Sequence, residues 1–319
     1  MNEQATGAQG GLRLIRQPLL ADRTSIRLGG EAIAELRAMT RPGLEQAAKV
    51  AQTLGGRAMV LGRGSNILAA DGPLPLVLVS LESSEEPRLV GEENGALLLH
   101  CHGGLKLSSL LAKAASLNLT GLEGLAGIPG SVGGAVAMNA GSFGVEIGSL
   151  VHEVEVFSPA GGFMTLQAGD VEFGYRRCRF LPFKEQAQQA GEESAQHARN
   201  WALVYGVTLA LRKSDEESVR RAMREVQRKK KQSQPIEAWS AGSTFKNPAP
   251  DAPAGLLLER AGMKGCGTGG MYFSEKHANF LVNTGNGTCA QALELIELAR
   301  TRVKAMSGHS LELEVRLWP

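Results

Sequence analysis

The sequence predicts a mixed fold of α-helices and β-strands arranged around one glycine-rich stretch. Apolar residues recur at helical spacing over residues 44–54, 106–119, 214–226 and 288–306. Apolar or alternating runs typical of strands cover residues 57–61, 76–81, 96–101, 151–157, 202–211 and 280–283. The stretch 121–148 has nine glycines among its 28 residues and no charged side chain from Gly124 to Val145. Glycine at this density lets a backbone come very close to a neighbouring segment or a ligand.

The N-terminal part begins with a polar, glycine-containing segment. We expect disorder over residues 1–12 and a flexible N-terminus through residue 20. The first helix should begin after Thr40, whose hydroxyl can cap it, and end at Gly55-Gly56.

Two glycine-containing loops are candidates for binding an anion. The strand over 57–61 runs directly into Gly62-Arg63-Gly64-Ser65-Asn66, and a glycine turn with Ser and Asn after a strand is typical of an anion cradle. In the stretch 121–148 we expect backbone N–H groups to cradle a large ligand that carries phosphates. The alternative is a set of tightly packed core turns with no ligand, because such N–H groups usually pair with other backbone.

The second half has two helix starts with capping patterns, Ser214…Glu217 and Thr288…Gln291. Residues 184–200 show no apolar face and are expected to form a surface insertion. The Gly-rich run 265–270 matches GxGxxG, but a helix precedes it and no βαβ unit surrounds it, so we reject a dinucleotide fold there. In the closing segment 311–318, strict alternation predicts Glu312, Glu314, Arg316 and Trp318 on one face.

Composition excludes several classes of function. The 319 residues are 43% hydrophobic and 5% aromatic and carry a net charge of +2, which argues against a nucleic-acid partner. Four cysteines without a CxxC pair predict no metal site and suit a reducing cytoplasm. No apolar run approaches transmembrane length, which predicts no membrane contact. There is no GxSxG, HExxH or Walker A lysine.

A set of polar residues remains in the second half: Arg176, Ser243, Lys246, Asn247, His277, Asn279, Glu314 and Arg316. Each also has an ordinary structural explanation. Ser243 can be a turn residue, His277 a buried structural histidine, and Glu314 part of an exposed strand pair.

Together the motifs resemble one family. The order GRGSN, GLEGLAGIPGSVGGAVAMNAG, FGYR, AGSTFKNP, SEKHANFLVN and LEVR is similar to that of UDP-N-acetylenolpyruvoylglucosamine reductases, from about Thr24 to Arg316. The resemblance implies an α+β fold. An FAD-binding half of two α+β subdomains, of the vanillyl-alcohol-oxidase (PCMH) type, is followed by an α+β substrate domain. We place the FAD-binding region at 21–213, with subdomains at about 21–80 and 81–213, and the substrate domain at 214–319.

The resemblance also implies the reaction, an NADPH-dependent reduction of an enolpyruvyl nucleotide sugar in peptidoglycan precursor synthesis. FAD would be bound non-covalently, and the enzyme would be a cytoplasmic monomer. The implied catalytic residues are Arg176, Ser243 and Glu314, with Ser243 as general acid. The implied cofactor-binding residues are Gly62, Arg63, Gly64, Ser65, Asn66, Ile128, Pro129, Gly130, Ser131, Gly133, Asn139 and Arg316. The implied substrate-binding residues are Tyr175, Lys246, Asn247, His277 and Asn279.

The sequence departs from the family pattern in places. The only tyrosines are Tyr175, Tyr205 and Tyr272, and the 212–218 connection is short, so the chain resembles the class that lacks a tyrosine-bearing loop. Leu313 stands where proline is usual. Two alternatives remain. The first is a flavin oxidase of the same fold, although residues 62–66 lack the histidine that often attaches FAD. The second is a non-catalytic nucleotide-sugar binder.

Overall fold

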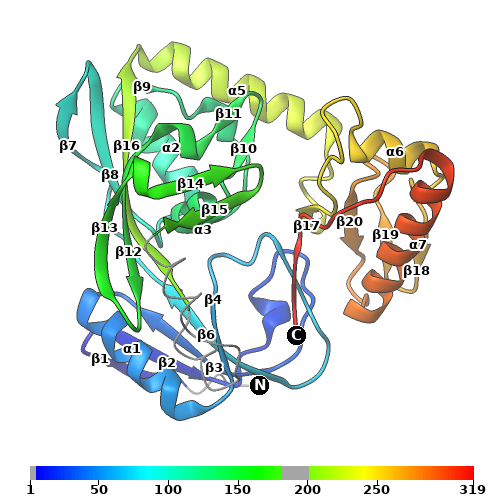
Figure 1. Cartoon of the computed structure of the whole chain (residues 1–319), viewed down its shortest axis with the longest axis horizontal. Helices are drawn as coiled ribbons and strands as arrows, with labels where there is room; N and C mark the ends of the chain where they lie inside the picture. The colour runs from blue at the N-terminus through cyan, green and yellow to red at the C-terminus, as the bar shows by residue number, and fades with distance from the viewer. Residues whose placement is uncertain (1–4, 182–200) are drawn as a thin grey trace. The chain divides into compact units, whose positions relative to one another are not determined.

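The computed structural model describes residues 5–181 and 201–319 (Figure 1). The predicted insertion at 184–200 lies outside the described residues. The chain divides into two compact units, each made of three segments. The first unit comprises Met1–Arg16, Ile33–Gly62 and Leu76–Arg228. The second comprises Gln17–Ala32, Arg63–Pro75 and Lys229–Pro319.

The first unit contains a five-stranded sheet covered by one helix. Its strand order is β1 (Ala5–Gln9), β2 (Leu12–Arg16), β3 (Ala32–Ala38), β6 (Leu74–Leu81) and β4 (Arg57–Val60). Helix α1 (Arg41–Leu54) buries Leu44 and Ala47 in a core shared with Leu36 and Val79. The Thr40 hydroxyl accepts a hydrogen bond from the Gly43 N–H at 3.1 Å, and Gly55 ends the helix with φ 72°. The predicted limits of this helix are confirmed.

The N-terminal strands correct the prediction of disorder over residues 1–12. β1 pairs with β2, and β2 pairs antiparallel with β3 from Leu12–Ala38 to Arg16–Ala34. Leu12 and Ile15 of β2 are buried, so β1 pairs with a strand that is held in place by apolar burial. The prediction is therefore wrong from Ala5 onward.

A second, antiparallel sheet of the first unit carries its largest core. The strand order is β13 (Gly162–Gln167), β12 (Val151–Ser158), β16 (Leu203–Lys213), β8 (Ala96–His102) and β7 (Arg88–Glu93), and β9 (Leu119–Thr120) pairs with the far end of β16. Helices α2 (Leu107–Ser116) and α3 (Val132–Ala137) cover one face (Figure 1). Leu110 and Val136 from these helices pack with Val207 and Leu209 of β16.

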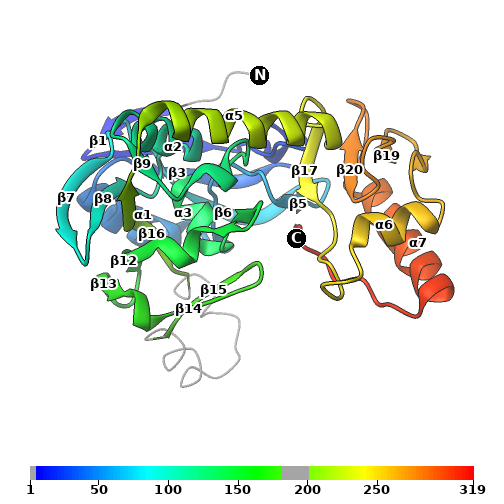
Figure 2. The same ribbon diagram turned by 90° about the horizontal axis from the view of Figure 1, so that it is seen from above.

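Short hairpins and single turns of 3-10 helix complete this face. The hairpins are β10 (Gly141–Ser142) with β11 (Val145–Glu146), and β14 (Val171–Gly174) with β15 (Arg177–Phe180). The turns are η2 (Glu123–Leu125), η3 (Ile147–Leu150) and η4 (Ala168–Asp170). The β14–β15 hairpin lies beside α3 (Figure 2).

Helix α5 (Glu216–Ser233) begins with a different cap from the predicted one. The Asp215 carboxylate accepts a hydrogen bond from the Ser218 N–H at 2.8 Å, and this bond holds the pKa of Asp215 below its usual range. The predicted Ser214…Glu217 capping box is therefore wrong by one residue. Aspartate caps as well as serine, so the two patterns compete in this sequence.

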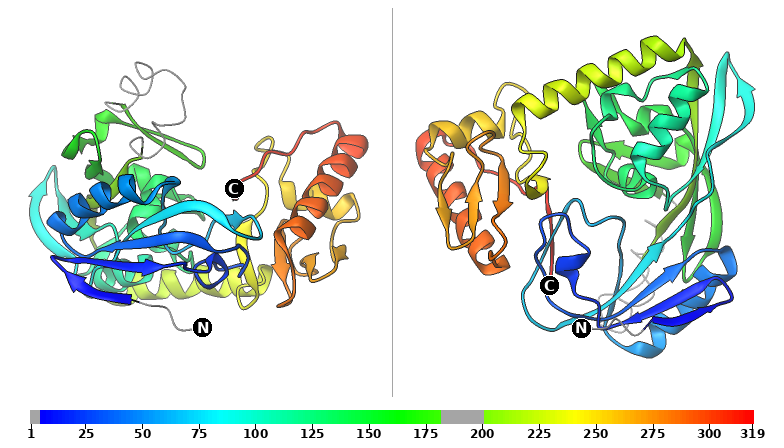
Figure 3. Two further views of the ribbon diagram at one scale, coloured as in Figure 1. Left: turned by 90° about the horizontal axis from the view of Figure 1, so that it is seen from below. Right: turned by 180° about the vertical axis from the view of Figure 1, so that it is seen from behind.

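The second unit is built on a four-stranded antiparallel sheet, β17 (Trp239–Ser243), β20 (Phe280–Asn283), β19 (Met271–Phe273) and β18 (Gly267–Thr268). Helices α6 (Ala254–Arg260) and α7 (Cys289–Ser307) pack against it (Figure 3). Thr288 and Gln291 form the predicted capping box of α7. The rejected GxGxxG run at residues 265–270 contains β18 and the turn that leads into β19.

Two segments distant in sequence join the same unit. β5 (Ile67–Ala69) pairs in parallel with β21 (Arg316–Trp318), and η1 (Leu20–Asp22) lies in the earlier segment, Gln17–Ala32.

The prediction of one face for Glu312, Glu314, Arg316 and Trp318 is wrong. The chain bends at Glu314 and Val315, which breaks the alternation before β21, and Trp318 is buried whereas Glu312 and Arg316 are exposed.

Candidate active site

Gly62 and Ser131, from the two predicted cofactor loops, lie against each other in the first unit. A Cβ atom placed on Gly62 would lie 2.9 Å from the Ser131 Oγ atom, so a side chain at position 62 would force the Ser131 hydroxyl to shift. The Ser131 hydroxyl accepts a hydrogen bond from the Gly134 N–H at 3.2 Å, which leaves its own proton available to a ligand. The fold thus brings together two loops that are about 70 positions apart in sequence. Loops that bind one ligand together must lie this close.

Two backbone N–H groups of the central glycine-rich loop donate hydrogen bonds to other backbone of the protein. The Val132 N–H donates to the Leu105 carbonyl at 2.9 Å, and the Gly133 N–H donates to the Gly103 carbonyl at 2.8 Å. These two N–H groups are not free for a phosphate. For this part of the loop the alternative of packed core turns is the better description.

The first glycine loop has the free donors that a phosphate needs. Among the described residues, the backbone N–H groups of Gly62, Arg63 and Gly64 donate no hydrogen bond. Three successive N–H groups of this kind form an anion-binding concavity. The loop therefore offers backbone donors of the kind that an anionic group such as a phosphate requires.

Asn139 is the most completely bonded of the predicted cofactor residues. Its side chain is 1% exposed, and its backbone has φ 40°, which asparagine tolerates. Nδ2 donates to the Glu146 carboxylate at 2.8 Å and to the Gly174 carbonyl at 3.1 Å, and Oδ1 accepts from the Gly148 N–H at 3.0 Å. All of these partners belong to the protein.

Arg176 lies at the tip of the β14–β15 hairpin, next to Tyr175. Its φ is 56°, and its Nη1 atom donates to the Gly141 carbonyl at 3.0 Å. The guanidinium carbon lies 5.6 Å from the centre of the Tyr175 ring, which is half exposed. The hairpin thus presents a cation and an aromatic ring at one turn, and the backbone of β10 fixes the cation.

In the second unit, Ser243 ends β17 directly after a β-bulge. The register shifts between Ser240 and Ser243, and Gly242 has φ 81°. A bulge re-aims the side chain that follows it. The Ser243 hydroxyl is half-buried and has no hydrogen-bond partner among the described residues, so its proton is available to a substrate.

Glu314 lies beside the second part of the first glycine loop. The Asn66 Nδ2 atom donates to the Glu314 carbonyl at 3.2 Å, and the Arg316 N–H donates to the Asn66 carbonyl at 3.0 Å. The Glu314 N–H in turn donates to the Thr244 carbonyl at 2.9 Å, next to Ser243. Within this unit the structure therefore brings together Asn66, Ser243, Glu314 and Arg316.

Three of the predicted substrate residues also have structural contacts. Asn279 is buried and bonds both backbone groups of Phe245, at 2.9 Å through Oδ1 and 2.8 Å through Nδ2. Asn247 accepts from the first N–H of α6 at 2.9 Å. Lys246 pairs with the Glu312 carboxylate at 3.3 Å. Their substrate roles stay predictions.

His277 is positioned by its own loop. Its Nδ1 atom accepts from the Asn279 N–H at 3.2 Å, so the neutral ring carries its proton on Nε2. Burial lowers the pKa of His277, which favours this neutral form. An Nε2–H donor suits an anionic or carbonyl oxygen.

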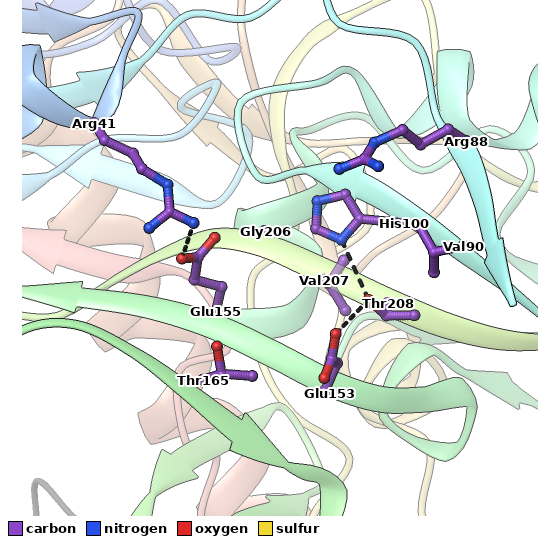
Figure 4. Close-up of a pocket in the computed structure, with 10 residues that line it drawn as sticks. All are labelled: Arg41, Arg88, Val90, His100, Glu153, Glu155, Thr165, Gly206, Val207 and Thr208. Carbon is purple, nitrogen blue, oxygen red and sulfur yellow. Dashed lines mark hydrogen bonds and ion pairs between the residues drawn. The ribbon is translucent and has the colours of Figure 1, made fainter.

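Sequence reasoning missed a polar pocket of about 270 Å³ in the first unit. Figure 4 shows the side chains that line it. Cross-strand register places His100 and Glu153 on either side of Thr208. The Thr208 hydroxyl lies 3.2 Å from His100 Nδ1 and donates to Glu153 at 3.0 Å. Burial, and then the Arg88 charge, lower the pKa of His100. Only strand pairing creates this row, so no local sequence signal marks it.

Comparison with known proteins covers both halves of the chain. Residues 35–167 match the FAD binding domain, and residues 234–318 match the C-terminal domain of UDP-N-acetylenolpyruvoylglucosamine reductase. The curated UDP-N-acetylenolpyruvoylglucosamine reductase of Nitratidesulfovibrio vulgaris is 45% identical over 96% of this chain and 98% of its own length. That of Oleidesulfovibrio alaskensis is 44% identical, with the same coverage of both chains.

The chain belongs to the UDP-N-acetylenolpyruvoylglucosamine reductase family. A crystal structure of the reductase from Thermus caldophilus has a TM-score of 0.76 and 33% identity, and the match covers 97% of this chain and 100% of that one. Membership in this reductase family confirms the predicted family, the α+β fold class, the enzyme class and the FAD cofactor.

Two further findings concern the described residues only. They contain no cluster of His, Cys, Asp and Glu that could hold a metal ion. No described helix is long and apolar enough to cross a membrane.

Proposed function

We propose that the predicted site residues of this chain carry out the reaction of its family. The enzyme reduces UDP-N-acetylglucosamine enolpyruvate to UDP-N-acetylmuramate in peptidoglycan precursor synthesis. One hydride from NADPH and one proton saturate the enolpyruvyl double bond, and NADP⁺ is released. The observation that carries this function is the family match, at 45% identity over 96% of the chain.

FAD would be held by Gly62 to Asn66, by the loop from Ile128 to Gly133, and by Arg316. The free N–H groups of Gly62, Arg63 and Gly64 support the placement of the pyrophosphate at this loop. FAD bound there would supply the hydride transfer from NADPH to the substrate. For Asn139 a direct cofactor contact finds no support in its contacts, all of which are with the protein.

The protein's own share of the chemistry is electrostatic stabilisation and proton transfer. Negative charge develops on the substrate carboxylate as hydride reaches C3, and the Arg176 guanidinium would stabilise it. Glu314 would orient that carboxylate or donate a proton to it. The Ser243 Oγ atom would then protonate C2 from one face, which fixes the configuration of the product. The unpartnered Ser243 hydroxyl supports this role.

The nucleotide-sugar substrate would be bound by Tyr175, Lys246, Asn247, His277 and Asn279. We assign FAD binding to residues 21–213 and substrate binding to residues 214–319. We place the enzyme in the cytoplasm, where NADPH and nucleotide sugars are made, and we expect a monomer.

The decisive experiment follows NADPH oxidation by the purified yellow protein, with and without the enolpyruvyl nucleotide sugar. We expect oxidation that depends on the sugar, with one product molecule per NADPH and a product mass higher by two hydrogens. A sugar-independent oxidation that consumes oxygen would support a flavin oxidase instead. A colourless protein that binds the sugar would support the non-catalytic alternative.

A further inference from the structure

Asn139 connects three backbone segments around the hairpin that carries Arg176. Its Oδ1 atom holds the start of η3 at Gly148, and its Nδ2 atom holds both the Glu146 carboxylate and the Gly174 carbonyl. The Asn139 side chain is tightly packed. A Cβ atom placed on Gly148 would lie 2.6 Å from Asn139 Oδ1 and 2.5 Å from the Phe173 ring. One buried amide therefore fixes where the β14 strand ends.

The same residue lies next to the second anchor of Arg176. Gly174 precedes Arg176 by two positions, and Gly141 follows Asn139 by two positions. Nδ2 of Asn139 holds the first, and Nη1 of Arg176 bonds the second at 3.0 Å. Asn139 therefore lies close to both anchors of Arg176. It bonds the backbone two residues before Arg176, and it is two residues from the carbonyl that orients the guanidinium.

We propose that Asn139 is a positioning residue for Arg176, acting through its hydrogen bond to the Gly174 carbonyl, and is not a cofactor ligand. This inference rests on the proposed function insofar as Arg176 is taken to act on the substrate. The geometry of the hairpin does not depend on that assignment. A displacement of about 1 Å at a catalytic group can slow a reaction by about 100-fold, so a hydrogen bond that sets the hairpin influences the rate.

The test separates the Gly174 bond from the Glu146 bond. Asn139→Asp keeps the size and the acceptor for Gly148, but it loses both donors and brings a second carboxylate beside Glu146. The double variant Asn139→Asp/Glu146→Gln removes that repulsion, because the Gln amide can donate back to the new carboxylate. Only the Gly174 carbonyl then lacks its donor. Glu146→Gln alone is the matched control, since Asn139 still bonds Gly174.

Three quantities are measured on each purified holoenzyme. They are the flavin bound per polypeptide, the hydrogen exchange of the peptide over residues 171–180 relative to that over 151–158, and the rates of the two half-reactions. For the double variant we expect unchanged flavin, faster exchange over 171–180, and reoxidation by the enolpyruvyl sugar slowed about 10- to 100-fold. Reduction by NADPH should stay within about twofold, and Glu146→Gln should behave as wild type.

Several results would overturn the proposal. Normal exchange and normal reoxidation in the double variant would mean that the Gly174 bond positions nothing. Loss of flavin with unchanged exchange would make Asn139 a cofactor ligand after all. If the double variant does not fold, Asn139→Ser, which is uncharged and too short to reach Gly174, replaces it. Failure of both to fold would assign Asn139 to stability alone.

Arg176→Ala, measured in parallel, keeps the two proposals distinguishable. If Arg176→Ala is reoxidised at the wild-type rate, the catalytic assignment of Arg176 fails. Faster exchange over 171–180 in the double variant would still show that Asn139 holds the hairpin.

Discussion

Asn66 donates a hydrogen bond to the backbone carbonyl of Glu314 at 3.2 Å, across 248 positions of sequence. The Asn66 carbonyl also accepts from the Arg316 N–H at 3.0 Å. A residue of the first glycine loop thus holds the backbone of a predicted catalytic carboxylate. Binding of a ligand to that loop and the placement of Glu314 are therefore mechanically linked within the second unit.

The first prediction compares Glu314 with its neighbour Glu312. Glu314→Gln should leave flavin reduction by NADPH and substrate binding normal, and it should slow flavin reoxidation by the enolpyruvyl sugar. Glu312 is 78% exposed and pairs only with Lys246 among the described residues, so Glu312→Gln should be nearly neutral in both half-reactions. Rapid-mixing absorbance of the flavin measures both rates.

Glu314→Ala then separates two roles of the carboxyl group. If Glu314 only orients the substrate, the Gln variant should keep much of the rate and the Ala variant should not. If Glu314 donates a proton, both should be slow. A crippled Glu312→Gln beside a normal Glu314→Gln would refute the assignment.

The second prediction concerns Ser243. Ser243→Ala should leave reduction by NADPH nearly intact, because that half-reaction needs no proton on C2. Reoxidation should slow by at least about 100-fold, the usual contribution of general acid catalysis. Ser310→Ala, at an exposed serine of the same unit, is the control. An equal loss in both half-reactions would indicate a structural serine.

The third prediction tests the first glycine loop with two alanine variants. Gly64 has φ 63°, and a Cβ atom there would overlap the Arg23 carbonyl oxygen. Gly64→Ala should therefore lower both the flavin bound per polypeptide and the free energy of unfolding. Gly72 has φ 82°, but a Cβ atom placed there would meet no atom within 4 Å, so Gly72→Ala should cost only the left-handed backbone penalty, about 1–2 kcal/mol. Equal flavin content in the two variants would contradict the role of the loop.

The fourth prediction is a fall in stability at acid pH. Burial lowers the pKa of His102 and His100 in the folded state below their ordinary value of 6.5. The unfolded chain then binds more protons, so the contribution of these two histidines to the free energy of unfolding is constant above about pH 6.5 and falls as the pH decreases from there to the folded-state pKa. His102→Gln should reduce this fall. Urea unfolding between pH 8 and pH 5 measures the difference, and parallel curves for the two proteins would refute it.

Local patterns predicted much of the fold. The caps at Thr40 and Thr288 were readable because a capping side chain bonds N–H groups two or three residues away. The same reasoning chose Ser214 over Asp215, since both are good caps and adjacent. The prediction of disorder over residues 1–12 failed because the residues of β1 gain order from pairing with β2, which composition does not report.

For the candidate site, too, the sequence predicted individual residues but not the contacts that the fold creates between them. Motif order named Ser243, Arg176 and Glu314, but it could not reveal that Asn139 and Asn66 bond the backbone of segments that carry predicted catalytic residues. Nor could it reveal the row His100, Thr208 and Glu153, which exists only through strand register. Strict alternation through Glu314 failed because the chain bends there to hydrogen-bond Thr244.

The parallel pairing of β5 with β21 has a consequence for synthesis on the ribosome. Ile67–Ala69 is translated early, whereas its partner Arg316–Trp318 is the last strand of the described chain to emerge. Until then β5 is an unpaired strand edge, open to wrong partners. Domains generally fold during synthesis from the N-terminal side, but here the glycine loop next to β5 must wait for the C-terminal strand. The mature geometry of that loop, and with it the flavin binding that we propose there, is therefore expected late in synthesis.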